Sequence, residues 1–156
     1  MKITILKHKS KNPRKLKNGD VYDSTLINWD GVEWDGVVNV DPTVSHDYQG
    51  EIIAGNYIAR KRIRTSGAIV WELETEEGKK EIPTTKPNKR HKGKSIMIAV
   101  QIHTGGRAWD GSHGCITIHP DAWYKIRKGW DDVIEVEIKE TKTEEAKAEA
   151  EENKDI

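Results

Sequence analysis

The sequence contains a single cysteine among 156 residues, and this scarcity excludes two classes of protein. The one thiol, Cys115, cannot form a disulfide within the chain and cannot supply a zinc site built from several thiolates. Long apolar runs are also missing, because the longest, residues 96–102, is far too short to span a bilayer. We therefore expect a soluble protein without membrane insertion, in which Cys115 acts as a thiol.

The charge is balanced overall but unevenly distributed. Residues 137–156 hold eight acidic and four basic residues, which leaves the remainder with a net charge of about +4. The basic residues cluster at 7–17, 60–64 and 86–94, but aromatic residues are not interleaved with them and no helical recognition pattern accompanies them. This arrangement favours a solvated surface and predicts no nucleic-acid partner.

The length and the composition predict one domain followed by a tail. A chain of 156 residues matches a single domain, and no internal boundary is visible. Residues 139–156 are rich in helix formers but have no apolar stripe to bury. We therefore predict a folded domain over residues 1–138 and a charged, disordered tail over 139–156.

Short segments with alternating or β-branched residues dominate the chain and favour strands. The run 95–102 is apolar almost throughout, which is typical of a strand covered on both faces, and a turn signal follows it. The fold class predicted is mainly β, an antiparallel sandwich or barrel-like structure with one short helix. The other predicted strands are 2–8, 21–29, 56–63, 68–73 and 133–138.

One helix is expected after residue 118. Pro120 and Asp121 suit its first turn, and Gly129 can adopt the left-handed conformation that ends a helix. Trp123, Tyr124 and Ile126 are expected to bury, and His119 is expected to lie at the start of the helix.

The most informative stretch is 102–119, which contains the only cysteine and three of the six histidines. A thiol with a pKa of about 8.5 is mostly neutral at pH 7, so a nucleophilic cysteine needs a neighbouring base or positive charge. His103, expected at the rim of a sheet, and His113, two residues before the thiol, are both candidates for that base. Gly114 leaves room for a substrate backbone and allows the amides of Gly114 and Cys115 to face a developing oxyanion.

The segment Ser112-His113-Gly114-Cys115-Ile116 resembles the Ser/Thr-His-Gly-Cys signature of the L,D-transpeptidases, the YkuD-like enzymes that act on peptidoglycan stem peptides. His103 and Thr104 resemble that family's histidine segment at the end of the preceding strand. The resemblance implies that Cys115 is the acylated nucleophile and His103 the base, with the Thr104 carbonyl orienting its imidazole. It also implies that His113 supports the site and that the amides of Gly114 and Cys115 form the oxyanion hole.

Two departures from the family pattern concern the substrate. Only eight residues separate His103 from Ser112, which makes this a short-loop variant, and Thr117 stands where the common forms carry Arg or Asn. Arg107 is a candidate for the missing carboxylate clamp, and Trp109 for a wall of the substrate groove. We predict substrate binding by Arg107, Trp109, Ser112 and Thr117.

The predicted function is acyl transfer from a peptidoglycan stem peptide through a Cys115 thioester, by a monomer that needs no cofactor. The site of action is the periplasm or the cell wall, although residues 1–7 do not read as a signal peptide. Two alternatives stay open: hydrolysis of peptidoglycan by a phage lysis protein or antibacterial effector, and a noncatalytic module that binds cell wall. A third hypothesis, which the sequence supports less well, is a zinc site formed by His103, His113, Cys115 and His119. The sequence therefore predicts no metal.

Overall fold

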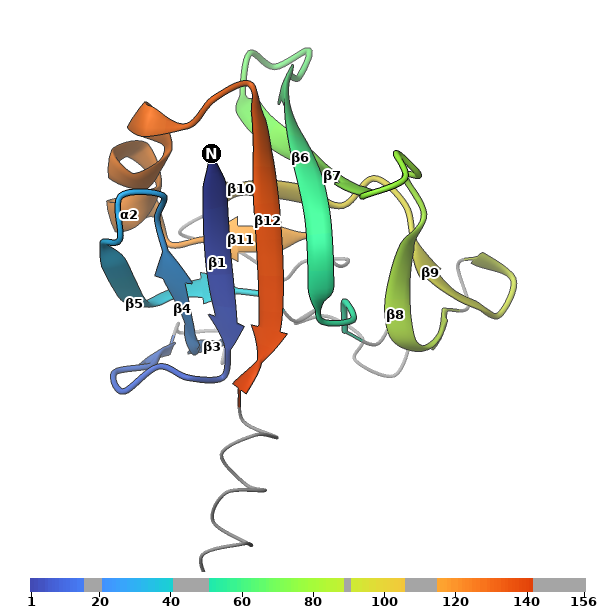
Figure 1. The fold of residues 1–156 in the computed structure, drawn as a ribbon, viewed down its shortest axis with the longest axis horizontal. Helices are drawn as coiled ribbons and strands as arrows, with labels where there is room; N and C mark the ends of the chain where they lie inside the picture. Colours follow the sequence, from blue (N-terminus) through green and yellow to red (C-terminus); the bar gives the residue numbers. More distant parts are fainter. Residues whose placement is uncertain (16–20, 41–50, 89–90, 106–114, 142–156) are drawn as a thin grey trace, which may run out of the picture.

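The computed structural model describes residues 1–15, 21–40, 51–88, 91–105 and 115–141. About 56% of this part is strand and about 10% is helical, so the prediction of a mainly β fold with one short α-helix is confirmed. Figure 1 shows a barrel, with a hairpin projecting from one side and the helix packed against the other.

The last strand of the barrel follows the alternating pattern from which it was predicted. In β12, Ile134, Val136 and Ile138 are buried while the residues between them face outward. The elements are β1 (Lys2–Lys7), β2 (Arg14–Lys15), β3 (Val21–Tyr22), β4 (Ser24–Ile27), β5 (Glu33–Asn39), β6 (Gly55–Ile63), β7 (Ile69–Thr75), β8 (Ile82–Asn88), β9 (Lys94–Met97), β10 (Gln101–Thr104), β11 (Ile116–Ile118), α2 (Pro120–Ile126), the 3₁₀ helix η2 (Arg127–Gly129) and β12 (Val133–Glu140).

Eight strands close the barrel in the order β1-β12-β6-β7-β10-β11-β5-β4, and β4 pairs with β1. Six of the eight pairings are antiparallel, whereas β1 with β12 and β10 with β11 run parallel. Full closure leaves no edge strand in this sheet. The strands β2 and β3 form a small ladder of their own, and β8 and β9 form the projecting hairpin.

The prediction of one continuous strand over residues 95–102 is wrong. This segment divides into β9, in the projecting hairpin, and β10, in the barrel, because Ala99 lies between them with a positive φ of 59°. That conformation turns the chain out of one sheet and into the other. Ile98 is consequently exposed rather than covered on both faces.

The helix lies where it was predicted, and His119 is its N-cap, with its Nδ1 atom accepting a hydrogen bond from the backbone amide of Asp121. Trp123 and Ile126 are buried as expected, but Tyr124 is exposed. Gly129 ends η2 without the predicted left-handed conformation.

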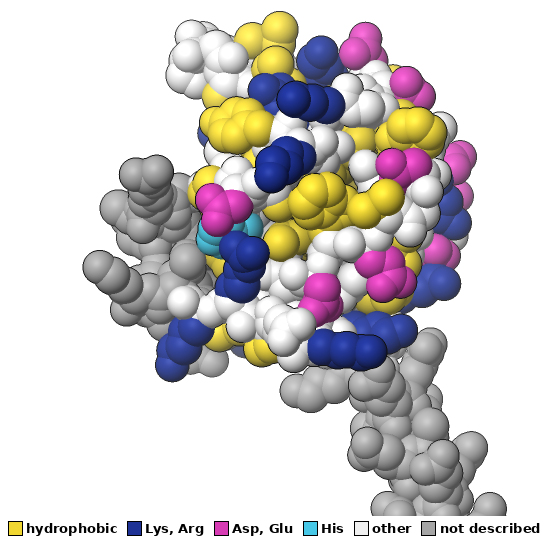
Figure 2. All heavy atoms as spheres, turned by 90° about the vertical axis from the view of Figure 1, so that its left-hand side faces the viewer, with side chains coloured by type: hydrophobic (Ala, Val, Ile, Leu, Met, Phe, Trp, Pro, Cys, Tyr) yellow, Lys and Arg dark blue, Asp and Glu magenta, His cyan; other side chains and the backbone are white. Residues whose placement is uncertain are grey.

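Three tryptophans anchor α2 and η2 to the barrel. Trp71 of β7, Trp123 of α2 and Trp130 lie edge to face, with ring centroids 5.0 to 5.9 Å apart. Each such pair adds about 0.5 to 1.5 kcal/mol beyond the burial of its area. On the side of the molecule that carries α2, hydrophobic side chains reach the surface among lysines and arginines (Figure 2).

At its C-terminal end the barrel continues past the predicted boundary at residue 138. Lys139 and Glu140 belong to β12, and the Thr141 hydroxyl donates a hydrogen bond of 2.6 Å to the Lys7 carbonyl. The remainder of the predicted tail, residues 142–156, lies outside the described residues. Within the described part, no helix has both the length and the apolar character needed to cross a membrane.

Candidate functional site

The site is organised by the parallel pair β10 and β11. Ile102 pairs with Ile116, His103 with Thr117 and Thr104 with Ile118. Ile102, Ile116 and Ile118 are fully buried in the core of the barrel. Because side chains alternate along a strand, His103 and Thr117 project together from the opposite, outer face. His103 is the third of the four residues of β10, one residue before the strand ends.

A hydrogen bond to the neighbouring backbone fixes the ring of His103. Its Nδ1 atom lies 2.7 Å from the carbonyl oxygen of Thr104. A carbonyl oxygen only accepts, so Nδ1 carries the proton and Nε2 is the nitrogen with a lone pair in the neutral ring. Thr104 therefore occupies the position that the sequence resemblance implied for it.

The surroundings of His103 favour its neutral form. Burial lowers the pKa of the ring below its usual 6.5, and the positive charge of Arg64 lowers it further, while the hydrogen bond to Thr104 acts in the opposite direction. At neutral pH the ring is consequently able to accept a proton, as a general base must.

Cys115 immediately precedes β11 and stands two residues before Thr117. In an extended chain this spacing brings side chains to one face, here the outer face that carries His103. The thiol is partly exposed, and its Sγ atom lies 3.9 Å from the carbonyl oxygen of Ala99. A carbonyl acceptor favours the protonated thiol, so a base is needed to generate the thiolate.

Polar side chains continue across the outer face on both sides of His103. Thr117 pairs with Asn39 of β5, and Gln101, two residues before His103, pairs with Glu72 of β7. Asn39, Thr117, Glu72 and Gln101 are all buried. Within the described residues, the buried hydroxyl of Thr117 has no hydrogen-bond partner. A buried polar atom left without a partner costs stability.

Several predicted site residues cannot be placed. His113, Gly114, Arg107, Trp109 and Ser112 lie outside the described residues. Of the predicted site, the described structure brings together His103, Thr104 and Thr117, with Cys115 immediately before the strand that contains Thr117.

Two further residues of the outer face were not among those predicted. Arg64, just after β6, contacts the side-chain oxygen of Gln101 through its guanidinium. The available signal was the spacing of Arg60, Arg62 and Arg64, because a period of two places all three on one face of a strand. The sequence alone did not reveal that this face continues to His103.

His119 serves the helix and not the outer face. Besides capping α2, its ring packs edge to face against Tyr22, with centroids 5.5 Å apart. Its Nδ1 atom and that of His103 are both already hydrogen-bonded. The alternative zinc site would have to use the Nε2 atoms of both rings.

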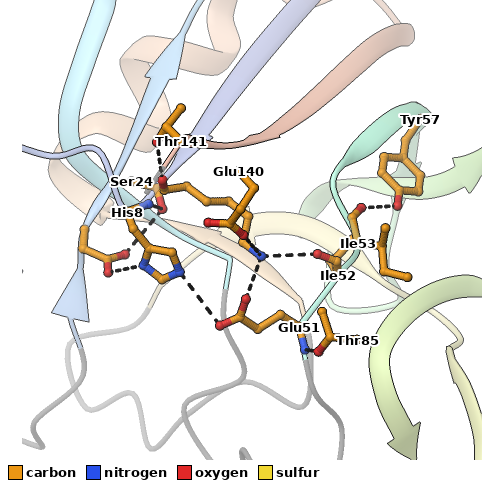
Figure 3. A network of polar contacts seen from close by, with 11 residues as sticks. His8, Ser24, Glu51, Ile52, Ile53, Tyr57, Thr85, Glu140 and Thr141 are labelled. Atoms are coloured by element: carbon orange, nitrogen blue, oxygen red, sulfur yellow. Dashed lines mark hydrogen bonds and ion pairs between the residues drawn. The ribbon is translucent and has the colours of Figure 1, made fainter. Parts of the chain in front are cut away.

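A second polar cluster closes the end of the barrel where β1 and β12 terminate (Figure 3). The Lys7 ammonium is 1% exposed and lies 2.8 Å from a carboxylate oxygen of Glu51 and 3.2 Å from one of Glu140. His8 approaches Glu51 from the other side, at 3.8 Å, and its Nδ1 atom lies 2.7 Å from Asp23. Interactions with His8 and Lys7 outweigh burial and lower the pKa of Glu51 to about 2.

The same cluster contains the one group of potential metal ligands found among the described residues. Donor atoms of His8, Glu51 and Glu140 lie within 4.8 Å of one another. The Lys7 ammonium, however, already lies against both carboxylates and supplies the positive charge that a cation would bring. We therefore interpret this cluster as a structural network.

Comparisons with models of protein families, with curated proteins and with solved structures gave no match. The functional argument consequently depends on the residues and the geometry of this chain.

Proposed function

We propose that this protein is a cysteine acyltransferase of the L,D-transpeptidase type, which acts on peptidoglycan stem peptides in the periplasm or cell wall. The observation that carries the proposal is the outward-facing His103, whose Nδ1 atom is tied to the Thr104 carbonyl. This arrangement leaves Nε2 as the proton acceptor, on the strand paired with the one that Cys115 precedes.

The spacing of the strands supports a contact between the base and the thiol. Cys115 is diagonal to His103 across the parallel pair, because Thr117 is the direct partner of His103. Neighbouring strands lie about 4.8 Å apart and alternate residues about 7 Å apart, so the two Cα atoms are separated by about 8 Å. An imidazole and a thiol directed toward each other can close that separation.

The proposed reaction has two half-steps. Nε2 of His103 takes the thiol proton, and the Cys115 sulfur attacks the carbonyl carbon of the diaminoacyl residue in the stem peptide. The carbon–nitrogen bond to the terminal D-amino acid breaks, and the departing amine takes the proton from the imidazolium. The resulting thioester passes its acyl group to an amine, which restores the thiol and forms the new amide.

The proposal is tested by incubating the protein with a stem tetrapeptide and measuring the mass of the intact protein. We expect a thioester adduct on the wild-type protein, with loss of the terminal amino acid, and none on Cys115→Ser. An amide product with an added amine indicates transfer, whereas a free acid indicates the hydrolytic alternative. Absence of any adduct and of any product would favour the noncatalytic wall-binding module.

His103 and His119 provide a matched pair for the role of the base. Both are partly buried histidines with a lowered pKa, but only His103 faces outward beside Thr117. We expect His103→Ala to slow acylation by about a hundredfold or more. His119→Ala removes a helix cap, which costs about 1 kcal/mol of stability, and should slow acylation little. Equal losses in the two variants would contradict the assignment.

A further inference from the structure

Arg64 differs from the other arginines on the outer face in its partner. The Nε atom of Arg60 lies 2.5 Å from a carboxylate oxygen of Glu74, and Nη1 of Arg62 lies 2.7 Å from one of Glu72. Arg64 instead contacts the neutral amide of Gln101. Within the described residues, no carboxylate lies within ion-pairing distance of Arg64.

The strand register explains this difference. Arg60, Arg62 and Arg64 alternate along β6 and its continuation, and β7 supplies a glutamate to each of the first two. Arg64 extends beyond the last paired residue, Ile63, into the turn toward β7, and reaches across to β10. Position 101 of β10 carries an amide, so the positive charge of this guanidinium is not neutralised there.

This charge lies close to the proposed base. Gln101 and His103 are alternate residues of β10, which places them on one face about 7 Å apart. The influence of Arg64 on the pKa of His103 is consistent with the same proximity. The side chain of Arg64 is exposed, whereas that of Gln101 is buried. The buried amide therefore positions the guanidinium, which remains accessible to a ligand from the solvent side.

We propose that Arg64, held by Gln101, binds the free terminal carboxylate of the donor peptide, and so restricts the enzyme to substrates that end one residue beyond the scissile bond. The inference rests on the proposed function and names its substrate class. A guanidinium suits this task because it offers paired donors to a carboxylate. A terminal carboxylate lies one residue spacing, about 4 Å, beyond the reacting residue, which fits a guanidinium near but not at the base.

The assignment separates two classes of peptidase. An enzyme that removes a terminal residue benefits from a positive charge at this position, whereas an enzyme that cleaves within a cross-linked peptide encounters a neutral amide there. Arg64 would therefore bind the terminal carboxylate, a role for which the sequence suggested Arg107.

The test compares two stem tetrapeptides that differ only at the C-terminus, one a free acid and the other a carboxamide. The measured quantity is the ratio of their second-order rate constants for acylation of Cys115, followed by intact mass. For the wild-type protein we expect the free acid to react about ten to a hundred times faster, the range typical of a hydrogen bond to a charged group. Arg64→Gln should bring the ratio close to one, and Arg64→Lys should restore part of it.

Two further variants distinguish a substrate contact from a structural role. Gln101→Glu places a carboxylate against Arg64, which imitates the pairs made by Arg60 and Arg62, and should lower the ratio although the guanidinium is still present. Arg60→Gln changes an exposed arginine of the same face and should keep the wild-type ratio. Circular dichroism checks the fold of each variant, and the turn at Arg64 is held by backbone bonds to Gly67 and Ala68.

The possible failures are distinguishable. Equal rates on the two peptides in the wild-type protein, or an unchanged ratio in Arg64→Gln, would overturn the role of Arg64 while the thioester chemistry stands. Failure of the wild-type protein to form a thioester with either peptide would overturn the proposed function, and this inference with it.

Discussion

Replacing Lys7 with methionine tests whether the buried ammonium stabilises the barrel or is merely tolerated. Lys7 lies at the end of β1, where it holds Glu51 and Glu140, two residues far apart in sequence. Methionine keeps the apolar stem of the side chain but removes the charge and the donors. The two carboxylates, each with a side chain about 32% exposed, would then lose the counter-ion that they share.

The size of the effect follows from the pKa of Glu51. A decrease from 4.5 to about 2 sets an upper bound of about 3 kcal/mol at neutral pH, and solvent screening of the partly exposed Glu51 reduces it; His8 supplies the largest part and Lys7 the next. Loss of the contact with Glu140 adds to the cost, whereas the ammonium no longer needs to be desolvated. We therefore expect Lys7→Met to lose about 2 kcal/mol at pH 7, or about 4 to 8 °C in Tm.

Urea unfolding followed by tryptophan fluorescence measures this loss, because Trp71, Trp123 and Trp130 are buried. Lys2→Met is the matched control: Lys2 lies on the same strand, but it is half exposed and pairs with Glu137 at 3.4 Å. A surface pair of this kind is worth less than about 1 kcal/mol. A Lys7→Met variant as stable as Lys2→Met would refute the argument.

The pH dependence of the difference gives a second check. Because Glu51 has a depressed pKa in the folded state, its contribution is complete above pH 4.5 and is lost as the pH falls toward about 2. The gap between wild type and Lys7→Met should therefore narrow on acidification below pH 4.5. A gap that widens would contradict the stabilising ion pair.

Two other predictions concern the site. Because the pKa of His103 is lowered, the acylation rate should fall with acidification only below pH 6.5, as the ring becomes protonated. Stopped-flow or quenched mass measurements between pH 4.5 and 8 give the midpoint of this fall. A midpoint above pH 6.5 would contradict the reasoning. Gly105→Ala should cost about 2 kcal/mol or more and impair acylation, because a Cβ there would lie 2.0 Å from the buried Tyr22 hydroxyl. Gly129→Ala should cost less, since it displaces the half-exposed Trp29, and equal losses in thermal unfolding would contradict this.

The sequence predicted those strands whose burial alternates along one continuous segment. β6 and β12 belong to this group, and β1 alternates over its first four residues. β7 is an exception, because it was predicted from its β-branched residues and is buried on both faces from Val70 to Leu73. β5 was missed because Gly36 interrupts its pattern. The structure gives the reason: a Cβ at Gly36 would lie 2.2 Å from the backbone oxygen of Asn12, a contact between distant segments. β8 was missed because Pro83 and Pro87 lie within it, in the two-stranded hairpin with β9.

The candidate site was predictable only in its local part. The presence of His103 and Cys115 in one short stretch, residues 102–119, was sufficient to predict that an imidazole and a thiol lie near each other, but not that β10 and β11 pair in parallel. Arg64 was not predictable as their neighbour, because its position depends on how β10 pairs with β7. The alternation of residues within one strand predicts which face of the sheet a residue occupies. It does not predict which strand lies next to that residue.

The parallel register of β10 and β11 has a consequence for the short interval between His103 and Ser112. A parallel pair cannot be joined by a two-residue hairpin, because the chain must return toward the start of the first strand before the second begins. Here the return is small: β10 ends at Thr104, and β11 begins at the level of Ile102. The position of Cys115 relative to His103 is then set by the pairing of Ile102 with Ile116 rather than by the length of the connection. A short loop is therefore compatible with the same arrangement of the proposed nucleophile and base.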